Sequence, residues 1–333
     1  MILVLISPRN AGLPFAQWLS EESGRLVAVV PLLFANRPAR GLRLRLLQFF
    51  GAGDGNITEY RCVICRKSDE IQVIQALTDY LSDRKSEWDL FVWTGIRGDE
   101  ITHNRSGNLL RIYKHTPEYL VSLPESWDKF RSGLSSNMKE KVRKCYRVLE
   151  RDGHPFKFRA VSRREDVSAS LDRFFELHAT RARHDDSTIH RDYFADVSHR
   201  EFLVDAARLL AERDQLRIFE LEIGGKVVAS RIAFLLGDEL YLYYSGYEPA
   251  WRKHSIMTTH TCECFKWAID QGVKAVNLSK GKDLSKMRWK GAEIIHYDGL
   301  LFSPTWRGRL LSRVYELLAR KPGLFAKLTE HRR

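Results

Sequence analysis

A lysine-rich segment around a single glycine is the first part of the chain that could carry chemistry. Residues 276–291 read VNLSKGKDLSKMRWKG, where a short apolar run gives way to a basic stretch at Gly281. Lys280, Lys286 and Arg288 place three cations just after the end of an expected buried strand. Ammonium and guanidinium groups donate hydrogen bonds to anions and to oxygen atoms that gain negative charge during a reaction. The segment is therefore a candidate site.

A second basic segment, WRKHS at residues 251–255, comes directly before an expected helix. Ser255 can cap this helix and Gly272 can end it. A helix start presents unpaired N–H groups and the positive end of the helix dipole, and a phosphate fits both features. Arg252 and Lys253 add positive charge at the same place, so the pattern favours an anion site.

The elements that must position these segments alternate between strands and helices, which predicts an α/β fold. In the first third of the chain, strands are expected at residues 26–34, 42–50 and 88–96, and a helix at 72–84. The sequence GAGDGN at 51–56 matches neither GxGxxG nor GxxxxGK[ST], and we interpret it as a turn.

A basic amphipathic helix is expected next. Met138, Val142, Cys145 and Leu149 share one helical face, and Gly153 ends the helix. The remaining sides carry six cations, namely Lys139, Lys141, Arg143, Lys144, Arg147 and Arg151. This surface is either a solvated face or a platform for an anionic substrate or a tRNA backbone.

The second half of the chain predicts a strand at 157–161, helices at 165–183 and 201–214, and three strands separated by Gly224-Gly225 and Gly237-Asp238. Such glycine turns are typical of an antiparallel meander. A helix, the strand before Gly281 and a final strand at 294–302 follow. His178 lies on the apolar stripe of its helix, and we interpret it as a core histidine. The last helix has one apolar face, which we expect to dock on the protein; its residues are Leu310, Leu311, Val314, Leu317 and Leu318.

Composition limits the classes of protein. The net charge of +12 favours anionic partners such as phosphate esters, nucleic acid or a membrane surface. Five scattered cysteines predict reduced thiols, and no run approaches the roughly 20 apolar residues of a membrane span. We therefore expect a cytoplasmic protein, with a peripheral contact to the inner membrane left open.

The order of elements resembles the GNAT acyltransferase fold, and three segments are similar to the FemAB-related, CelD-like acetyltransferases. They are LSSNMKEKVRKCYRVLERDG, YYSGYEPAWRKHSIMTTHTCECFKWAIDQG and the segment around Gly281, where Asn277, Gly281, Lys286 and Trp289 match the family pattern. The resemblance covers most of residues 120–300. It implies an α/β fold of tandem GNAT-like units, with mixed, mostly antiparallel sheets flanked by helices.

The implied domains are a degenerate N-terminal GNAT-like domain at 1–120, a connecting basic helical region at 121–153, a C-terminal GNAT acyltransferase domain at 154–305 and a basic amphipathic helix at 306–333. The first domain is expected to be shortened, because the chain opens directly on a strand where the family has a preceding segment. The family signature [QR]xxGx[GA] is missing, since the loop reads WRKHSIMT. Family members often have tyrosine where Ser285 stands, so a tyrosine proton donor is not carried over.

The resemblance also implies the roles of individual residues. The cofactor is acetyl-CoA or another acyl-CoA, with no metal, and it is expected at the start of the helix, on Arg252, Lys253, Ser255, Ile256 and Met257. Lys286 is the first choice for stabilising the developing negative charge. A general base is sought among Glu248, Asp283 and His254. Arg181, Tyr244, Tyr247 and Trp289 are expected to contact the substrate.

The expected function is acyl-CoA-dependent N-acyltransfer to a small-molecule amine, an amino sugar or related precursor, in cell-surface polysaccharide biosynthesis. One alternative is a FemAB-type transferase that uses aminoacyl-tRNA, the only case in which nucleic acid is a partner. Another is a non-catalytic scaffold of a polysaccharide-synthesis complex. The basic C-terminal helix is the expected contact with a membrane or a polysaccharide synthase.

Overall fold

A computed structural model describes residues 2–8, 15–19, 26–39, 42–51, 57–97, 110–184 and 190–319. The chain forms two compact units, one of Met1–Thr116 with Ile295–Arg333 and the other of Pro117–Ile294. Residues 52–56 of the expected turn and residues 320–333 of the expected C-terminal helix lie outside the described residues. The four domains proposed from the sequence stay predictions.

The first unit contains a mixed sheet with the strand order β2-β1-β3-β4-β6-β13, and β5 pairs with β3. Strands β1–β3 and β4–β6 pair in parallel, and the other pairs are antiparallel. The elements are β1 Ile2–Pro8, β2 Phe15–Leu19, β3 Ala28–Ala39, β4 Leu42–Phe49, β5 Ile64–Cys65, η1 Lys67–Asp69, α1 Glu70–Asp83, β6 Leu90–Arg97, β13 Ala292–Phe302 and α9 Trp306–Ala319. Strand β7, Leu110–Ser122, passes into the second unit.

The core of the first unit forms where the apolar face of α1 meets the sheet. Val73, Ile74, Leu77 and Leu81 follow helical spacing and are all buried, as the periodicity predicts. Beside this core, the buried carboxylate of Asp89 forms ion pairs with Arg45 and Arg307.

Much of the apolar stripe of α9 is exposed, contrary to the expected docking through this face; Leu311 is half-buried, and the side chain of Leu318 lies outside the described residues. Trp306, Leu310, Val314 and Leu317 have exposed fractions of 72%, 51%, 42% and 66%. The helix packs instead through other residues: a Cβ on Gly308 would meet the backbone of Ser303, and Tyr315 packs on Phe302. The close approach at Gly308 needs a residue without a side chain, and it determines which side of the helix faces the protein.

The second unit contains a sheet with the strand order β7-β12-β11-β10-β9-β8. Only β11 and β12 pair in parallel. The elements are α3 Trp127–Gly133, α4 Ser136–Arg151, β8 Phe156–Val161, α5 Arg164–Arg183, α6 Val197–Glu212, β9 Leu216–Ile223, β10 Lys226–Leu236, β11 Glu239–Tyr247, η3 Pro249–His254, α7 Ile256–Asp270, β12 Ala275–Lys280 and α8 Leu284–Met287.

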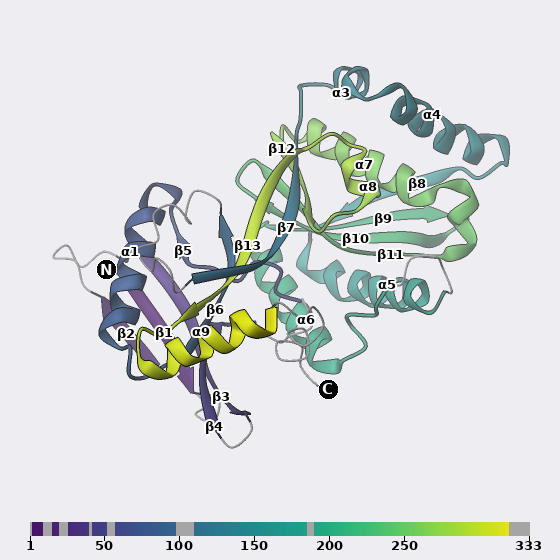
Figure 1. The fold of residues 1–333 in the computed structure, drawn as a ribbon. Helices are drawn as coiled ribbons and strands as arrows, with labels where there is room; N and C mark the ends of the chain where they lie inside the picture. Colours follow the sequence, from purple (N-terminus) through teal and green to yellow (C-terminus); the bar gives the residue numbers. More distant parts are fainter. Residues whose placement is uncertain are drawn as a thin grey trace. The chain divides into compact units, whose positions relative to one another are not determined.

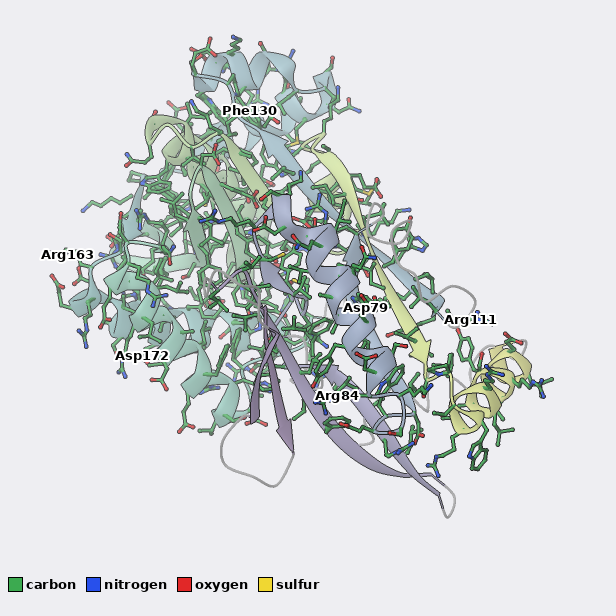
Figure 2. The ribbon with its side chains drawn as sticks, turned by 90° about the vertical axis from the view of Figure 1, so that its left-hand side faces the viewer. Asp79, Arg84, Arg111, Phe130, Arg163 and Asp172 are labelled. Atoms are coloured by element: carbon green, nitrogen blue, oxygen red, sulfur yellow. The ribbon has the colours of Figure 1, made fainter. Side chains whose placement is uncertain are left out.

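Helices cover both faces of this sheet (Figure 1). Helices α3, α4 and α7 share one core with the strands, in which Phe130 stacks on Phe265. Helix α5 packs on the other face, against β10 and β11. Its exposed residue Asp172 and the exposed Arg163 just before the helix are labelled in Figure 2.

The expected mixed α/β fold, with mostly antiparallel sheets flanked by helices, is confirmed. The meander β9-β10-β11 turns at Gly224-Gly225 and at Gly237-Asp238, and all three glycines have positive φ. Met138, Val142, Cys145 and Leu149 of α4 are buried, as their spacing predicts. His178 is also buried and lies within 3.1 Å of the Ser245 carbonyl oxygen, as expected of a core histidine.

Candidate active site

Strands β11 and β12 part after a short parallel pairing. Residues Glu239–Tyr241 pair with Ala275–Asn277, whereas the rest of β11, up to Tyr247, has no partner in β12. Strand β12 stays beside β7, where Lys280 pairs with Glu118. Beyond Tyr241 the edge of β11 is therefore not covered by β12, and the side chains of His178 and Arg181 contact the Ser245 carbonyl oxygen there.

A bulge lies in β11 at the same level. Its pairing with β10 runs from Arg231 opposite Ser245 to Ala233 opposite Leu242, so β11 has one more residue than β10 between these pairs. The inserted residue changes which face the following side chains occupy. Tyr243 and Tyr244, the two residues of the bulge, have ring centroids 4.4 Å apart.

Helix α7 begins next to this edge, after the turn that carries Arg252 and Lys253. The N–H groups of Thr258 and Thr259 donate to the Ser255 carbonyl oxygen, at 2.8 and 3.3 Å. The structure gives no backbone acceptor for the N–H groups of Ile256 and Met257, which lie in a fully described stretch. This helix start therefore has the donors and the dipole that an anion needs.

Ser255 takes up the conformation that the missing glycine would have favoured. It is the N-cap residue of α7, but its side chain forms no capping hydrogen bond, which corrects the expected capping role. Its φ of 56° and ψ of 37° are left-handed. The turn therefore has the left-handed shape without a glycine, although a serine in this conformation costs about 1–2 kcal/mol.

Lys286 lies at the end of β12. From α8, its Nζ donates to Ser279 Oγ at 2.9 Å and to the Lys280 carbonyl oxygen at 2.6 Å. Ser279 has a φ of 63°, which places its hydroxyl group under the lysine, and the φ of Gly281 is 109°. The sharp turn expected at Gly281 is thus present, and it returns the basic segment over the end of the strand.

Of the candidate general bases, Glu248 is the one whose carboxylate is unpaired. It directly follows β11, and among the described residues its carboxylate has neither a hydrogen-bond nor an ion-pair partner. Asp283 instead caps α8, accepting a hydrogen bond from the Ser285 N–H at 2.7 Å. His254 is buried, and its Nε2 lies 3.1 Å from Asp152 Oδ2.

The four residues expected to contact the substrate do not all lie in one place. Trp289 is 3% exposed and stacks on Phe265, with 4.8 Å between the ring centroids. It anchors the basic segment in the core and offers little surface to a substrate. Tyr244 packs among aromatic residues on the α5 side of the sheet, including His178 at 5.8 Å between centroids.

Arg181 and Tyr247 come together at the unpaired edge of β11. The Arg181 guanidinium carbon lies 5.4 Å from the centre of the Tyr247 ring, and Arg181 Nη1 donates to Ser245 Oγ at 3.2 Å. Arg181 also lies within hydrogen-bonding distance of the His190 ring. These two predicted contacts share one location, while Tyr244 lies in an aromatic cluster nearby.

Sequence reasoning named Arg288 without giving it a role, and it missed Ser279 and Arg231. Arg288 Nη2 reaches Thr258 Oγ1 in the first turn of α7 at 3.4 Å, and burial lowers the pKa of this arginine. Ser279 holds Lys286, and Arg231 faces Ser245 across the bulge. The basic segment in the sequence pointed to Arg288, but the positions of the other two depend on strand register and left-handed backbone.

The described residues contain no group of three histidine, cysteine or acidic side chains placed to hold a metal ion. Among the same residues, no helix is long and apolar enough to cross a membrane.

The geometry defines the class of fold: an α/β domain in which a meander leads to two parting parallel strands and a helix start. Residues 136–291 match the family model of the acetyltransferase (GNAT) domain. The search of curated proteins found no match.

Solved structures share this fold at low sequence identity. FemX matches with a TM-score of 0.56 and 12% identity, over 90% of this chain and 89% of FemX. The C-terminal domain of a protein described as a lysylphosphatidylglycerol synthetase, from Agrobacterium fabrum, matches with a TM-score of 0.53 and 12% identity, over 86% and 85% of the two chains. A conserved protein of unknown function from Bacteroides thetaiotaomicron matches with a TM-score of 0.51 and 12% identity, over 77% and 79%. The expected GNAT-like, FemAB-like fold is confirmed.

Proposed function

We propose that the second unit transfers an acyl group from acyl-CoA to the amine of a small molecule. The observation that carries this proposal is the parting of β11 and β12 beside the start of α7. The place where β12 leaves β11 suits the amide-bearing pantetheine arm of CoA, and the helix start suits its pyrophosphate. The match to an acetyltransferase (GNAT) domain supports the same class of reaction.

In the proposed reaction, the amine nitrogen attacks the thioester carbonyl carbon, a C–N bond forms, and the C–S bond then breaks to release CoA. The charge of Lys286 at the end of β12 stabilises the oxygen that becomes negative. Glu248, whose carboxylate has no partner among the described residues, accepts the proton that the amine loses. An amino sugar or related precursor of a cell-surface polysaccharide is our proposed acceptor, from family analogy alone.

Isothermal titration with acetyl-CoA tests the proposal. We expect micromolar binding that weakens by about 10-fold or more in the Arg252→Ala/Lys253→Ala variant, since two cations leave the helix start. Lys226→Ala, which removes an exposed lysine from the β9–β10 turn, is the matched control and should bind normally. Absence of binding to acetyl-CoA and longer acyl-CoAs would contradict the proposal and favour the scaffold alternative.

A second candidate donor, aminoacyl-tRNA, is favoured by a groove on α3 and α4. The groove has a volume of about 780 Å³ and is lined by cations that include Lys139, Arg143 and Arg147. The Lys266 ammonium at its wall lies 4.4 Å from the centre of the Tyr146 ring. The Tyr146 ring is half-buried, and cations beside accessible aromatic rings are the features that bind a single-stranded nucleic acid end.

The exposed stripe of α9 supports a peripheral contact with a membrane. Trp306 and three aliphatic side chains face solvent, and the exposed Arg309 and Arg313 lie on the same helix. Apolar side chains with flanking cations are typical of helices that lie in an anionic lipid surface. A polysaccharide synthase stays the alternative partner, and a cytoplasmic location stays a prediction.

A further inference from the structure

Arg231 lies in the middle of β10, next to the bulge of β11. It pairs with Phe219 of β9 and with Ser245 of β11, so the three side chains share one face of the sheet. Phe219 belongs to the core beneath α7, where its ring centroid is 5.0 Å from that of Trp267. The Arg231 side chain therefore points toward α7, at the level where β11 has left β12.

Among the described residues, the Arg231 guanidinium has no partner. Its Nε is buried and has no hydrogen bond, and no ion pair or hydrogen bond involves its other nitrogen atoms. The two Nη atoms are not fully buried, so they keep contact with solvent. The side chain as a whole is half-buried, so its tip is not fully enclosed by the protein.

Other arginines in this sheet and on the helix α5 that packs against it show that this lack of a partner is unusual. Arg217, on β9, donates to two carbonyl oxygens and to Asp214. Arg159 and Arg173 share the buried carboxylate of Glu220. A buried polar group without a partner is rare in folded proteins and calls for an explanation.

The described groups that act on the Arg231 charge supply no negative charge. Burial lowers the pKa of Arg231, and the Arg181 guanidinium acts in the same direction. Burial, with a smaller effect of Arg231, lowers the pKa of His260 to about 3, so this ring is neutral. Burial raises the pKa of the Cys264 thiol to about 12, so it is neutral as well. A desolvated cation with only neutral and positive neighbours is costly, and a bound anion would offset the cost.

We propose that Arg231 binds a carboxylate carried by one of the two reactants, which makes the enzyme selective for an acidic acyl group or an acidic acceptor. This inference rests on the proposed acyl transfer. The phosphates of the donor belong at the start of α7, on Arg252 and Lys253, whereas Arg231 lies inside the sheet beside the bulge. The two Nη atoms present the planar, paired donors that a carboxylate accepts, and Ser245 lies alongside.

Two pairs of probes separate the possible sources of the carboxylate. Succinyl-CoA against acetyl-CoA tests the acyl group, and glucosaminic acid against glucosamine tests the acceptor. We expect a preference for the acidic member in one pair, lost by about 10–100-fold in Arg231→Gln and partly kept in Arg231→Lys. Binding of the neutral member should not change.

Arg217→Gln is the matched control, because it removes a second guanidinium from the same sheet face near Trp267. This control should keep the preference but lower the melting temperature, since Arg217 is hydrogen-bonded. Arg231→Gln should leave the melting temperature unchanged or raise it, because it removes an unpaired charge. If Arg231 had a purely structural role, Arg231→Gln would lower the melting temperature.

The outcomes distinguish the inference from the proposed function. Acetyl-CoA binding without a preference in either pair would contradict the inference and leave the acyltransferase standing. A preference that survives in Arg231→Gln would also overturn it, as would a marked loss of stability in both Arg231 variants. If no CoA thioester binds, the proposed function fails, and a preference for glucosaminic acid that depends on Arg231 would still establish the carboxylate site.

Discussion

At the scale of single residues, Lys286 is the group whose replacement tests the chemistry most directly. Its Nζ is held by Ser279 Oγ and the Lys280 carbonyl oxygen, so the charge has a fixed position. We expect Lys286→Ala to lower kcat by about 10–100-fold and to leave the dissociation constant of acetyl-CoA nearly unchanged, because the stabilisation arises in the transition state.

The matched control for this variant is Lys282→Ala, an exposed lysine of the same segment. Steady-state kinetics with titration of the donor measure both quantities. An unchanged kcat in Lys286→Ala would remove the lysine from the chemistry.

Asp89 provides a prediction about pH. Burial alone would raise the pKa of this carboxyl group, but the hydrogen bonds from Arg45 and Arg307 outweigh it and hold the pKa well below its usual range. A lowered folded pKa means that the group stabilises the fold above its unfolded pKa of roughly 3.9 and loses this effect as the pH falls below that value.

We therefore expect Asp89→Asn to lower the free energy of unfolding by about 2–4 kcal/mol at pH 7, because two arginines lose their counter-charge. The difference from the wild type should shrink as the pH falls from about 5 toward 2. Urea unfolding across this range measures it, and a difference independent of pH would count against the ion pairs.

At the scale of elements, two serines have left-handed backbone, one at the start of α7 and one at the end of β12. We expect their replacement by glycine to affect the transfer rate differently. Ser255→Gly relieves a φ of 56° and loses no capping bond, so we expect a gain of about 0.5–1 kcal/mol with normal transfer. Ser279→Gly relieves a φ of 63° but removes an acceptor of Lys286, so the transfer rate should fall. Equal activity in both variants would show that Ser279 does not position the lysine.

Helix α9 carries a prediction about membranes. Replacing Trp306 and Leu310 by serine should weaken sedimentation with phosphatidylglycerol vesicles by about 10-fold or more, because two large apolar groups leave the exposed stripe. Leu236→Ser removes a similarly exposed leucine, 53% accessible, from the second unit and should have no effect. If the wild type and the Trp306/Leu310 variant sediment with vesicles equally, the stripe does not bind the membrane, and a protein partner becomes the better explanation.

At the scale of the whole molecule, the net charge of +12 makes any association with nucleic acid dependent on salt. If the groove on α3 and α4 binds tRNA, the Lys139→Ala/Arg143→Ala variant should reduce the slope of log K against log salt by about 1–2. Lys141→Ala/Lys144→Ala removes two cations of the same helix that do not line the groove. Fluorescence anisotropy with bulk tRNA should separate the two variants, and equal slopes would mean general charge attraction.

Local patterns in the sequence determined much of the fold. The spacing of Met138, Val142, Cys145 and Leu149 predicted the buried face of α4, and the glycine turns predicted the meander. Such features depend on neighbours a few residues away, so periodicity and backbone preference are enough to specify them. The return of the chain at Gly281 also followed from sequence, because one residue without a side chain permits it.

Contacts between distant residues were decided only by the tertiary structure. The place of β7 beside β12, the left-handed Ser279 and the exposed stripe of α9 depend on which surfaces meet, and an isolated segment carries no record of that. Arg231 illustrates the point: in the sequence it is one arginine within an apolar strand. Its lack of a partner becomes visible only when β9, β11 and α7 surround it without a carboxylate, because the electrostatic cost of a charge is set by its whole environment.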